Sequence, residues 1–289
     1  MSRISYVRSV DGTRIGYRTS GTGPPLVLVH GASADSTVMS LLTPLVEQHY
    51  TVHAVDRRGR GVSGDRPVYD ITLEYADVAA VVNERARATG QTISLYGHSY
   101  GAVCAIGAAL LTSSIERLFL YEPGFGAVLS PQPGVLDQLD DLVAAGQDDA
   151  ALEHTYRTAV GMSAHDVAAM RRQPTWRARL ASLPTISREL RVAAGLQFDS
   201  VPYRALGIPS VLLVGERSTP GQKSVVAAVH AALPQSTVVA LPGQAHAAQI
   251  TAPDLLADAL IRHHPWQAAS RDCSVPAATA SGAASSLPT

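Results

Sequence analysis

The residues best suited to chemistry are a serine between two glycines and a distant histidine. Residues 97–101 read Gly-His-Ser-Tyr-Gly, after a strand-like segment and before an apolar helical pattern. This G-x-S-x-G pattern predicts a tight strand-to-helix turn, in which a side chain at either glycine would collide with its neighbours. The turn would hold the Ser99 hydroxyl at a helix N-terminus, where free N–H groups favour developing negative charge. Ser99 is the predicted nucleophile, and an ordinary glycine-rich turn is the alternative.

His246 is the predicted general base among the ten histidines of the chain. It follows a predicted strand, lies far downstream of Ser99 and precedes a predicted helix in a loop of small residues. His263 and His264 instead end the last predicted helix, where a histidine suits the helix dipole. His98, next to Ser99, is expected to be a packing or pocket residue.

Short apolar segments are predicted to form the strands that position these residues. They lie at 26–29, 51–55, 92–96, 118–121, 210–214 and 237–241, with helical patterns at 73–88, 102–111 and 254–264 between or after them. Thr72 is the expected start of the first helix. The alternation predicts an α/β fold with a mostly parallel sheet flanked by helices. Residues 4–8 and 14–18 flank the turn dipeptide Asp11-Gly12, which predicts an antiparallel hairpin at one edge.

The alternation breaks between about 124 and 205, where the sequence shows helical patterns and no convincing strand. These patterns lie at 135–145, 150–159, 164–171 and 186–194. We predict a helical cap at 124–205, inserted into a core domain of residues 1–123 and 206–266 and roofing a pocket. An independent helical domain is the alternative. Residues 267–289 are rich in Ala, Ser and Pro, which predicts a disordered tail.

Five residues of the predicted cap are candidates to line that pocket. They are large apolar or aromatic side chains, and for each of them core packing is favoured over ligand contact: Tyr156, Met162, Met170, Trp176 and Leu196.

The motifs together resemble those of the α/β-hydrolase superfamily, over residues 4–265. Besides the Ser99 motif, they are His-Gly-Ala at 30–32, Asp-Arg-Arg-Gly-Arg-Gly-Val-Ser-Gly at 56–64 and Gly-Gln-Ala-His at 243–246. The resemblance implies the α/β-hydrolase fold, in which the nucleophile comes first and the histidine last. It also implies an oxyanion hole formed by the backbone amides of Ala32 and Tyr100. His30 would order its loop.

The loop at 56–64 admits two interpretations. Its three arginines among glycines could bind phosphate. The glycines do not match a P-loop, however, and no Lys-Ser or Lys-Thr pair follows. The favoured interpretation is a turn in which Arg58 and Asp56 stabilise the loop beside the pocket.

The sequence departs from the family's pattern at the carboxylate that would orient the catalytic histidine. The usual family position, three residues after the glycine that ends the seventh strand, is Ser218 here. Glu216 lies in the same loop, two positions early, and Glu122 ends the sixth predicted strand, where haloalkane dehalogenases and zearalenone lactonases carry their acid. A strand end is a firm place for a carboxylate that must orient a histidine. Glu122 is favoured as the acid, and Glu216 remains the alternative. If Glu122 is not the acid, its expected role is structural, as the partner of an arginine such as Arg58 in an ion pair.

The predicted activity is that of a carboxylesterase-like serine hydrolase. It would cleave an ester, thioester or lactone of a small molecule through an acyl-enzyme on Ser99. No cofactor and no metal are expected. Epoxide hydrolysis and dehalogenation are disfavoured, because family members with those activities use aspartate as nucleophile. The alternatives are a cofactor-free perhydrolase, cyclase or lyase, and a non-catalytic ligand-binding homologue.

The composition of the chain limits the kinds of binding partner to be expected. The 289 residues are 46% hydrophobic, with a formal net charge of −1 and no basic run, so neither nucleic acid nor an anionic membrane is indicated. A small-molecule substrate is expected, and the oligomeric state is left open. Two cysteines make no disulfide framework, and no Cys/His spacing resembles a zinc site. Without a signal-like start or an apolar run of about 18 residues, the expected location is cytoplasmic.

Overall fold

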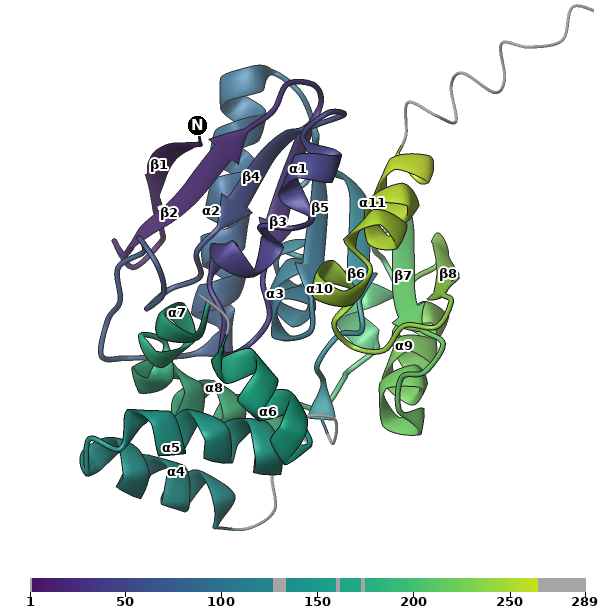
Figure 1. Ribbon diagram of the computed structural model, residues 1–289. Coiled ribbons are helices and arrows are strands. Elements are labelled where there is room, and N and C mark those ends of the chain that lie inside the picture. The colour runs from purple at the N-terminus through teal and green to yellow at the C-terminus, as the bar shows by residue number, and fades with distance from the viewer. Residues whose placement is uncertain (1, 127–133, 160–161, 173–174, 265–289) are drawn as a thin grey trace, which may run out of the picture.

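The computed structural model describes residues 2–126, 134–159, 162–172 and 175–264. Its centre is an eight-stranded sheet with the strand order β1-β2-β4-β3-β5-β6-β7-β8 (Figure 1). The strands are β1 (Arg3–Arg8), β2 (Arg14–Ser20), β3 (Pro25–Val29), β4 (Thr51–Val55), β5 (Ile93–His98), β6 (Ile115–Tyr121), β7 (Ser210–Gly215) and β8 (Ser236–Leu241). The β1–β2 hairpin is antiparallel and joins β4 antiparallel, whereas all other pairings are parallel. The predicted α/β fold with an antiparallel edge is confirmed.

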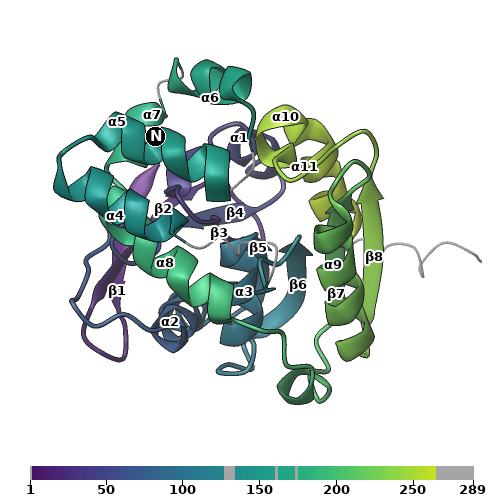
Figure 2. The same cartoon turned by 90° about the horizontal axis from the view of Figure 1, so that it is seen from below.

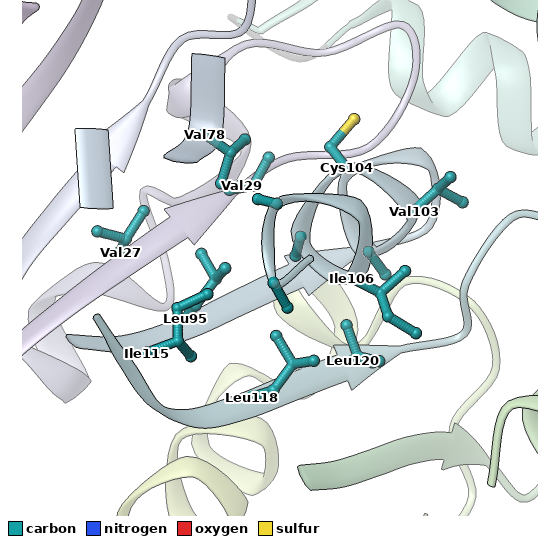
Figure 3. Close-up of a cluster of buried hydrophobic side chains, with 14 of the residues drawn as sticks. Val27, Val29, Val78, Leu95, Val103, Cys104, Ile106, Ile115, Leu118 and Leu120 are labelled. Carbon is teal, nitrogen blue, oxygen red and sulfur yellow. The ribbon is translucent and has the colours of Figure 1, made fainter. Parts of the chain in front are cut away.

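The central strands β3, β5 and β7 are buried on both faces, and their side chains alternate between two cores. In β3, Val27 and Val29 enter one core while Leu26 and Leu28 enter the other. The first core packs against α2 (Ile71–Thr89), α3 (Tyr100–Ala108) and α9 (Pro220–Ala232). Figure 3 shows part of it, with Leu95 of β5 among the labelled side chains. The second core packs against α1 (Thr43–Val46), α10 (Ala248–Thr251), α11 (Pro253–Arg262) and the 3₁₀ helix Ser36–Met39.

Two helix starts differ from the sequence-based expectation. Asp70, not Thr72, caps α2, because its carboxylate accepts a hydrogen bond from the Thr72 amide at 2.8 Å. Helix α9 was not predicted, although Thr219 and Gln222 form a capping box around Pro220. A capping box with proline in the first turn is a readable start signal.

The described residues between β6 and β7 form five α-helices, and we call them the inserted helices. They are α4 (Val135–Ala144), α5 (Asp148–His154), α6 (Ala164–Arg171), α7 (Trp176–Leu180) and α8 (Leu183–Gly195), with a π-helical segment at Thr155–Ala159. Figures 1 and 2 show them gathered at one end of the sheet. They share a small apolar cluster that includes Leu152 and Ile186. The cap boundaries at 124 and 205 stay a prediction, as does the tail, which lies outside the described residues.

A buried ion network ties α8 to the sheet domain. Glu189 of α8 lies 2.7 Å from Nη2 of Arg57 and 2.6 Å from Nη2 of Arg60. Arg57 also pairs with Glu74 of α2 at 3.2 Å, and all four side chains are almost fully buried. The network fixes the inserted helices against the loop that follows β4. In the described ranges, no helix is long and apolar enough to cross a membrane.

Candidate active site

Ser99 occupies the turn between β5 and α3. Its backbone has φ 54° and ψ −120°, a strained conformation for a residue other than glycine. A Cβ atom on Gly97 would overlap the backbone of Gly101 and Ala102, and a Cβ on Gly101 would overlap the carbonyl oxygens of Val29 and His30. Both flanking positions therefore require glycine for the reason that the sequence pattern indicated.

Ser99 and His246 line one cavity of about 200 Å³ between the sheet domain and the inserted helices. The loop after β3 contributes Gly31 and Ala32 to the same cavity. Ser99 is only 5% exposed, so its hydroxyl is shielded from bulk water. The sheet thus brings together three segments that lie far apart in the sequence.

Glu122 holds His246. It follows β6 directly, with φ 45°, and its Oε2 lies 2.6 Å from Nδ1 of His246. With the proton on Nδ1, His246 donates to the carboxylate and leaves Nε2 free to accept a proton. Glu122 Oε1 accepts hydrogen bonds from the Gly215 amide, at 2.7 Å, and from the Ser218 hydroxyl. Burial raises the pKa of Glu122, but the His246 charge and these hydrogen bonds outweigh it and hold that pKa below the ordinary 4.5.

Ser218 is a functional residue that sequence reasoning missed. It occupies the position at which the family usually carries its aspartate, and its hydroxyl donates to Glu122. Ser218 is buried, and β7 lies beside β6 in the sheet, so the usual and the displaced acid positions are neighbours in space. The hydroxyl therefore supports a carboxylate that arrives from the adjacent strand.

The alternatives considered for the acid are not brought to His246. Glu216 is exposed, and its Oε2 accepts from the Gly243 amide at 2.7 Å. Arg58 pairs with Asp77 at 2.7 Å and with Asp11 at 3.1 Å, so the expected alternative of an ion pair between Arg58 and Glu122 is wrong.

The two residues expected to form the oxyanion hole differ in how they face the cavity. Ala32 lines it directly. Tyr100 is the first residue of α3, where backbone amides lack intrahelical partners. The Tyr100 side chain points elsewhere, because its hydroxyl lies 2.7 Å from that of Tyr69. Only the amide of Tyr100 could therefore serve an oxyanion.

His30 orders the loop that carries Ala32. Its Nδ1 lies 2.8 Å from the Gly31 carbonyl oxygen, and the Arg57 amide donates to its Nε2 at 3.2 Å. Burial, with the nearby Arg57 and Arg60 charges, lowers the pKa of His30 well below its usual range. A neutral imidazole with one donor and one acceptor fits both contacts.

His98 and Gln249 form a second polar pair at the cavity. Nε2 of His98 lies 2.7 Å from the carbonyl oxygen of His246, and Nε2 of Gln249 lies 3.4 Å from Nδ1 of His98. Burial, with the adjacent His246, lowers the pKa of His98 strongly. Neutral His98 therefore donates to His246 and accepts from Gln249. The Gln249 Oε1 atom is buried without a hydrogen-bond partner among the described residues.

The 56–64 loop has a structural role. Arg57, Arg58 and Arg60 are buried and pair with carboxylates, so none of them is available to a phosphate. Asp56 accepts hydrogen bonds from the amides of Ser36, at 2.7 Å, and Val62, at 3.0 Å. The structure agrees with the interpretation of this segment as a stabilised turn.

Three of the five candidate pocket residues line the cavity, namely Tyr156, Met162 and Met170. The other two are packing residues, which is the role that the sequence favoured. Trp176 packs inside the inserted helices, where its indole N–H donates to Asp149 at 2.8 Å. Leu196 packs against the sheet core instead. Within the described ranges, no group of three or more His, Cys, Asp or Glu side chains could hold a metal ion.

Comparison with known proteins agrees with this architecture. Residues 26–259 match the model of the alpha/beta hydrolase family. The chain is 28% identical over 265 residues to 2-(acetamidomethylene)succinate hydrolase of Mesorhizobium japonicum, which covers 88% of this chain and 93% of that protein. It is 32% identical over 118 residues to N-formylmaleamate deformylase of Pseudomonas putida, covering 40% of this chain and 43% of the relative.

Among solved structures, an alpha/beta hydrolase from Sphaerobacter thermophilus superposes with a TM-score of 0.78 and 30% identity, covering 89% of this chain and 99% of that one. The family match extends over most of the chain, from the first residues of β3 into α11. The chain is therefore a hydrolase of the alpha/beta hydrolase family.

Proposed function

We propose that the protein is a carboxylesterase-like serine hydrolase that cleaves an ester, thioester or lactone of a small molecule through an acyl-enzyme on Ser99. The observation that carries the proposal is the 2.6 Å contact between Glu122 and His246, beside the strained turn of Ser99. A histidine held by a buried carboxylate is the arrangement that activates a serine hydroxyl.

The roles follow from the geometry. His246 takes the proton of Ser99 while the hydroxyl oxygen attacks the carbonyl carbon, and Glu122 stabilises the resulting imidazolium. The amides of Ala32 and Tyr100 donate to the oxyanion. His246 then protonates the leaving group, and a water molecule, deprotonated by His246, attacks the acyl-enzyme and frees the acid.

Cleavage of an acylated nitrogen is a second candidate function. Two relatives are named 2-(acetamidomethylene)succinate hydrolase and N-formylmaleamate deformylase, names that denote the hydrolysis of an acetamido compound and the removal of a formyl group. The same residues would serve this reaction, with His246 protonating an amine in place of an alcohol. A panel of small esters, thioesters, lactones and N-acyl compounds would separate the two classes.

The first test is covalent labelling with a small uncharged alkyl fluorophosphonate. We expect the wild type to be labelled at Ser99, and Ser99→Ala and His246→Ala to lose labelling, with mass spectrometry locating the adduct. Thermal unfolding of each variant checks that it is folded.

A folded wild type that stays unlabelled, and that also fails to hydrolyse 4-nitrophenyl acetate, would refute the proposal and favour a ligand-binding homologue. Turnover that survives Ser99→Ala would indicate a lyase, which uses the oxyanion hole without a covalent intermediate. Peracid formation with added peroxide would indicate a perhydrolase.

A further inference from the structure

Arg179 is a buried cation in the wall of the cavity that holds Ser99. It lies on α7 and is 9% exposed. Its Nη1 donates to the Tyr156 hydroxyl at 2.7 Å and to the Ser33 carbonyl oxygen at 3.3 Å. Both acceptors are neutral, and Arg179 has no carboxylate partner among the described residues.

The other buried arginines of the described chain show how unusual this is. Arg57, Arg58 and Arg60 each pair with at least one carboxylate within 3.2 Å. An arginine buried without a counter-charge is unfavourable, because the guanidinium loses its hydration without an ionic partner. The three paired arginines do not line the cavity, whereas Arg179 is part of its wall.

The cavity has a charge pattern suited to an anion. Its lining contains no Asp or Glu, and Arg179 is its only Lys or Arg among the described residues. The Nε atom of Arg179 is buried without a hydrogen-bond partner, and no described residue accepts from Nη2. Nε and Nη2 form one edge of the planar guanidinium, and that edge matches the two oxygens of a carboxylate.

We propose that Arg179 anchors a carboxylate of the substrate, so that the substrate class is a short carboxylate-bearing ester or N-acyl compound. This inference rests on the proposed function, because it concerns the same cavity. Arg179 and Tyr156 both contact Ser33, the residue after Ala32. The carboxylate would therefore lie beside the oxyanion loop, and the cavity of about 200 Å³ limits the substrate to a short chain.

The test measures how well small acids protect Ser99 from an uncharged alkyl fluorophosphonate. Succinate is compared with its uncharged isostere succinamide, in the wild type and in Arg179→Met. In the wild type, half-protection needs at least about 10-fold less succinate than succinamide. Arg179→Met raises the succinate concentration needed for half-protection about 10- to 100-fold, as expected for loss of a charge-assisted hydrogen-bonded pair. In this variant, succinate and succinamide therefore protect at similar concentrations.

Arg177→Met is the matched control. Arg177 lies on the same helix, carries the same charge and is exposed, so this variant keeps the succinate-to-succinamide ratio of the wild type. Arg179→Lys keeps part of the preference, because the charge stays while the planar fork is lost.

Three outcomes would overturn the assignment. The first is equal protection of Ser99 by succinate and succinamide in the wild type. The second is an equal loss of protection by both compounds in Arg179→Met. The third is protection by inorganic phosphate but not by succinate. If folded wild type is not labelled at all, the proposed function fails instead. Calorimetric binding of succinate to the wild type and to Arg179→Met then decides the role of Arg179 on its own.

Discussion

At the scale of single residues, Glu122 shows how a carboxylate can be buried and still remain charged. It accepts from the Gly215 amide, the Ser218 hydroxyl and the His246 imidazole, so both oxygens are engaged. Removing the charge while keeping the shape should therefore affect His246 more than the fold.

We expect Glu122→Gln to lower kcat by about 10³- to 10⁴-fold, because an amide cannot stabilise the imidazolium and favours the wrong histidine tautomer. Steady-state kinetics on the best ester found would measure the loss. Glu216→Gln is the control, since that side chain is exposed and its carboxylate accepts a hydrogen bond from the Gly243 amide, away from His246. A large loss for Glu216→Gln with little loss for Glu122→Gln would contradict the acid assignment.

At the scale of elements, the loop after β4 joins the sheet domain to α8 through buried charges. Glu189 is the carboxylate that both Arg57 and Arg60 contact. Burial raises the pKa of Glu189, and the two arginines oppose that rise. Glu189 thus contributes a buried ionic contact to the attachment of the inserted helices.

Glu189→Gln should lower the free energy of unfolding by about 3–5 kcal/mol. The substitution removes the carboxylate that Arg57 and Arg60 share, and the remaining carboxylate, Glu74, pairs with Arg57. Urea unfolding measures the change. Arg191→Gln on the same helix is the control, since its ion pairs with Asp137 and Asp140 are exposed and contribute little. An equal effect of the two substitutions would show that the buried network does not anchor α8.

At the scale of the whole molecule, buried histidines make stability depend on pH. His30, His53, His98 and His264 are all buried with lowered pKa values. For His53, burial and the charges of Arg85 and Arg3 lower the pKa from 6.5 to about 4. As pH falls below 6.5, the unfolded chain binds protons that the folded protein does not bind.

The free energy of unfolding should therefore decrease as pH falls from 6.5 to about 4, with His53 alone responsible for roughly 3 kcal/mol at about 1.4 kcal/mol per pKa unit. Below pH 4 the folded state is protonated as well, and this contribution stops growing. Urea unfolding at several pH values would show a shallower slope for His53→Gln. Identical slopes for the two proteins would refute the assignment.

The strands and the turn at Ser99 could be predicted from the sequence, because they depend on residues close together in the chain. Runs such as 26–29, which reads Leu-Val-Leu-Val, predicted strands, since a strand buried on both faces is apolar along its length. The spacing of glycines around Ser99 predicted the turn, because backbone collisions leave no other residue type possible there. The resemblance to a known family predicted the fold and left two candidates, Glu122 and Glu216, for the acid.

Tertiary structure decided the features that depend on which segments become neighbours. Only the pairing of β6 with β7 places Ser218 against Glu122, although 96 residues separate them. Likewise, Trp176 and Arg179 lie on one short helix, yet one packs inside the inserted helices and the other faces the cavity. Sequence constrains the conformation of each segment, whereas the burial and ion pairing of a side chain depend on residues that only folding brings to it.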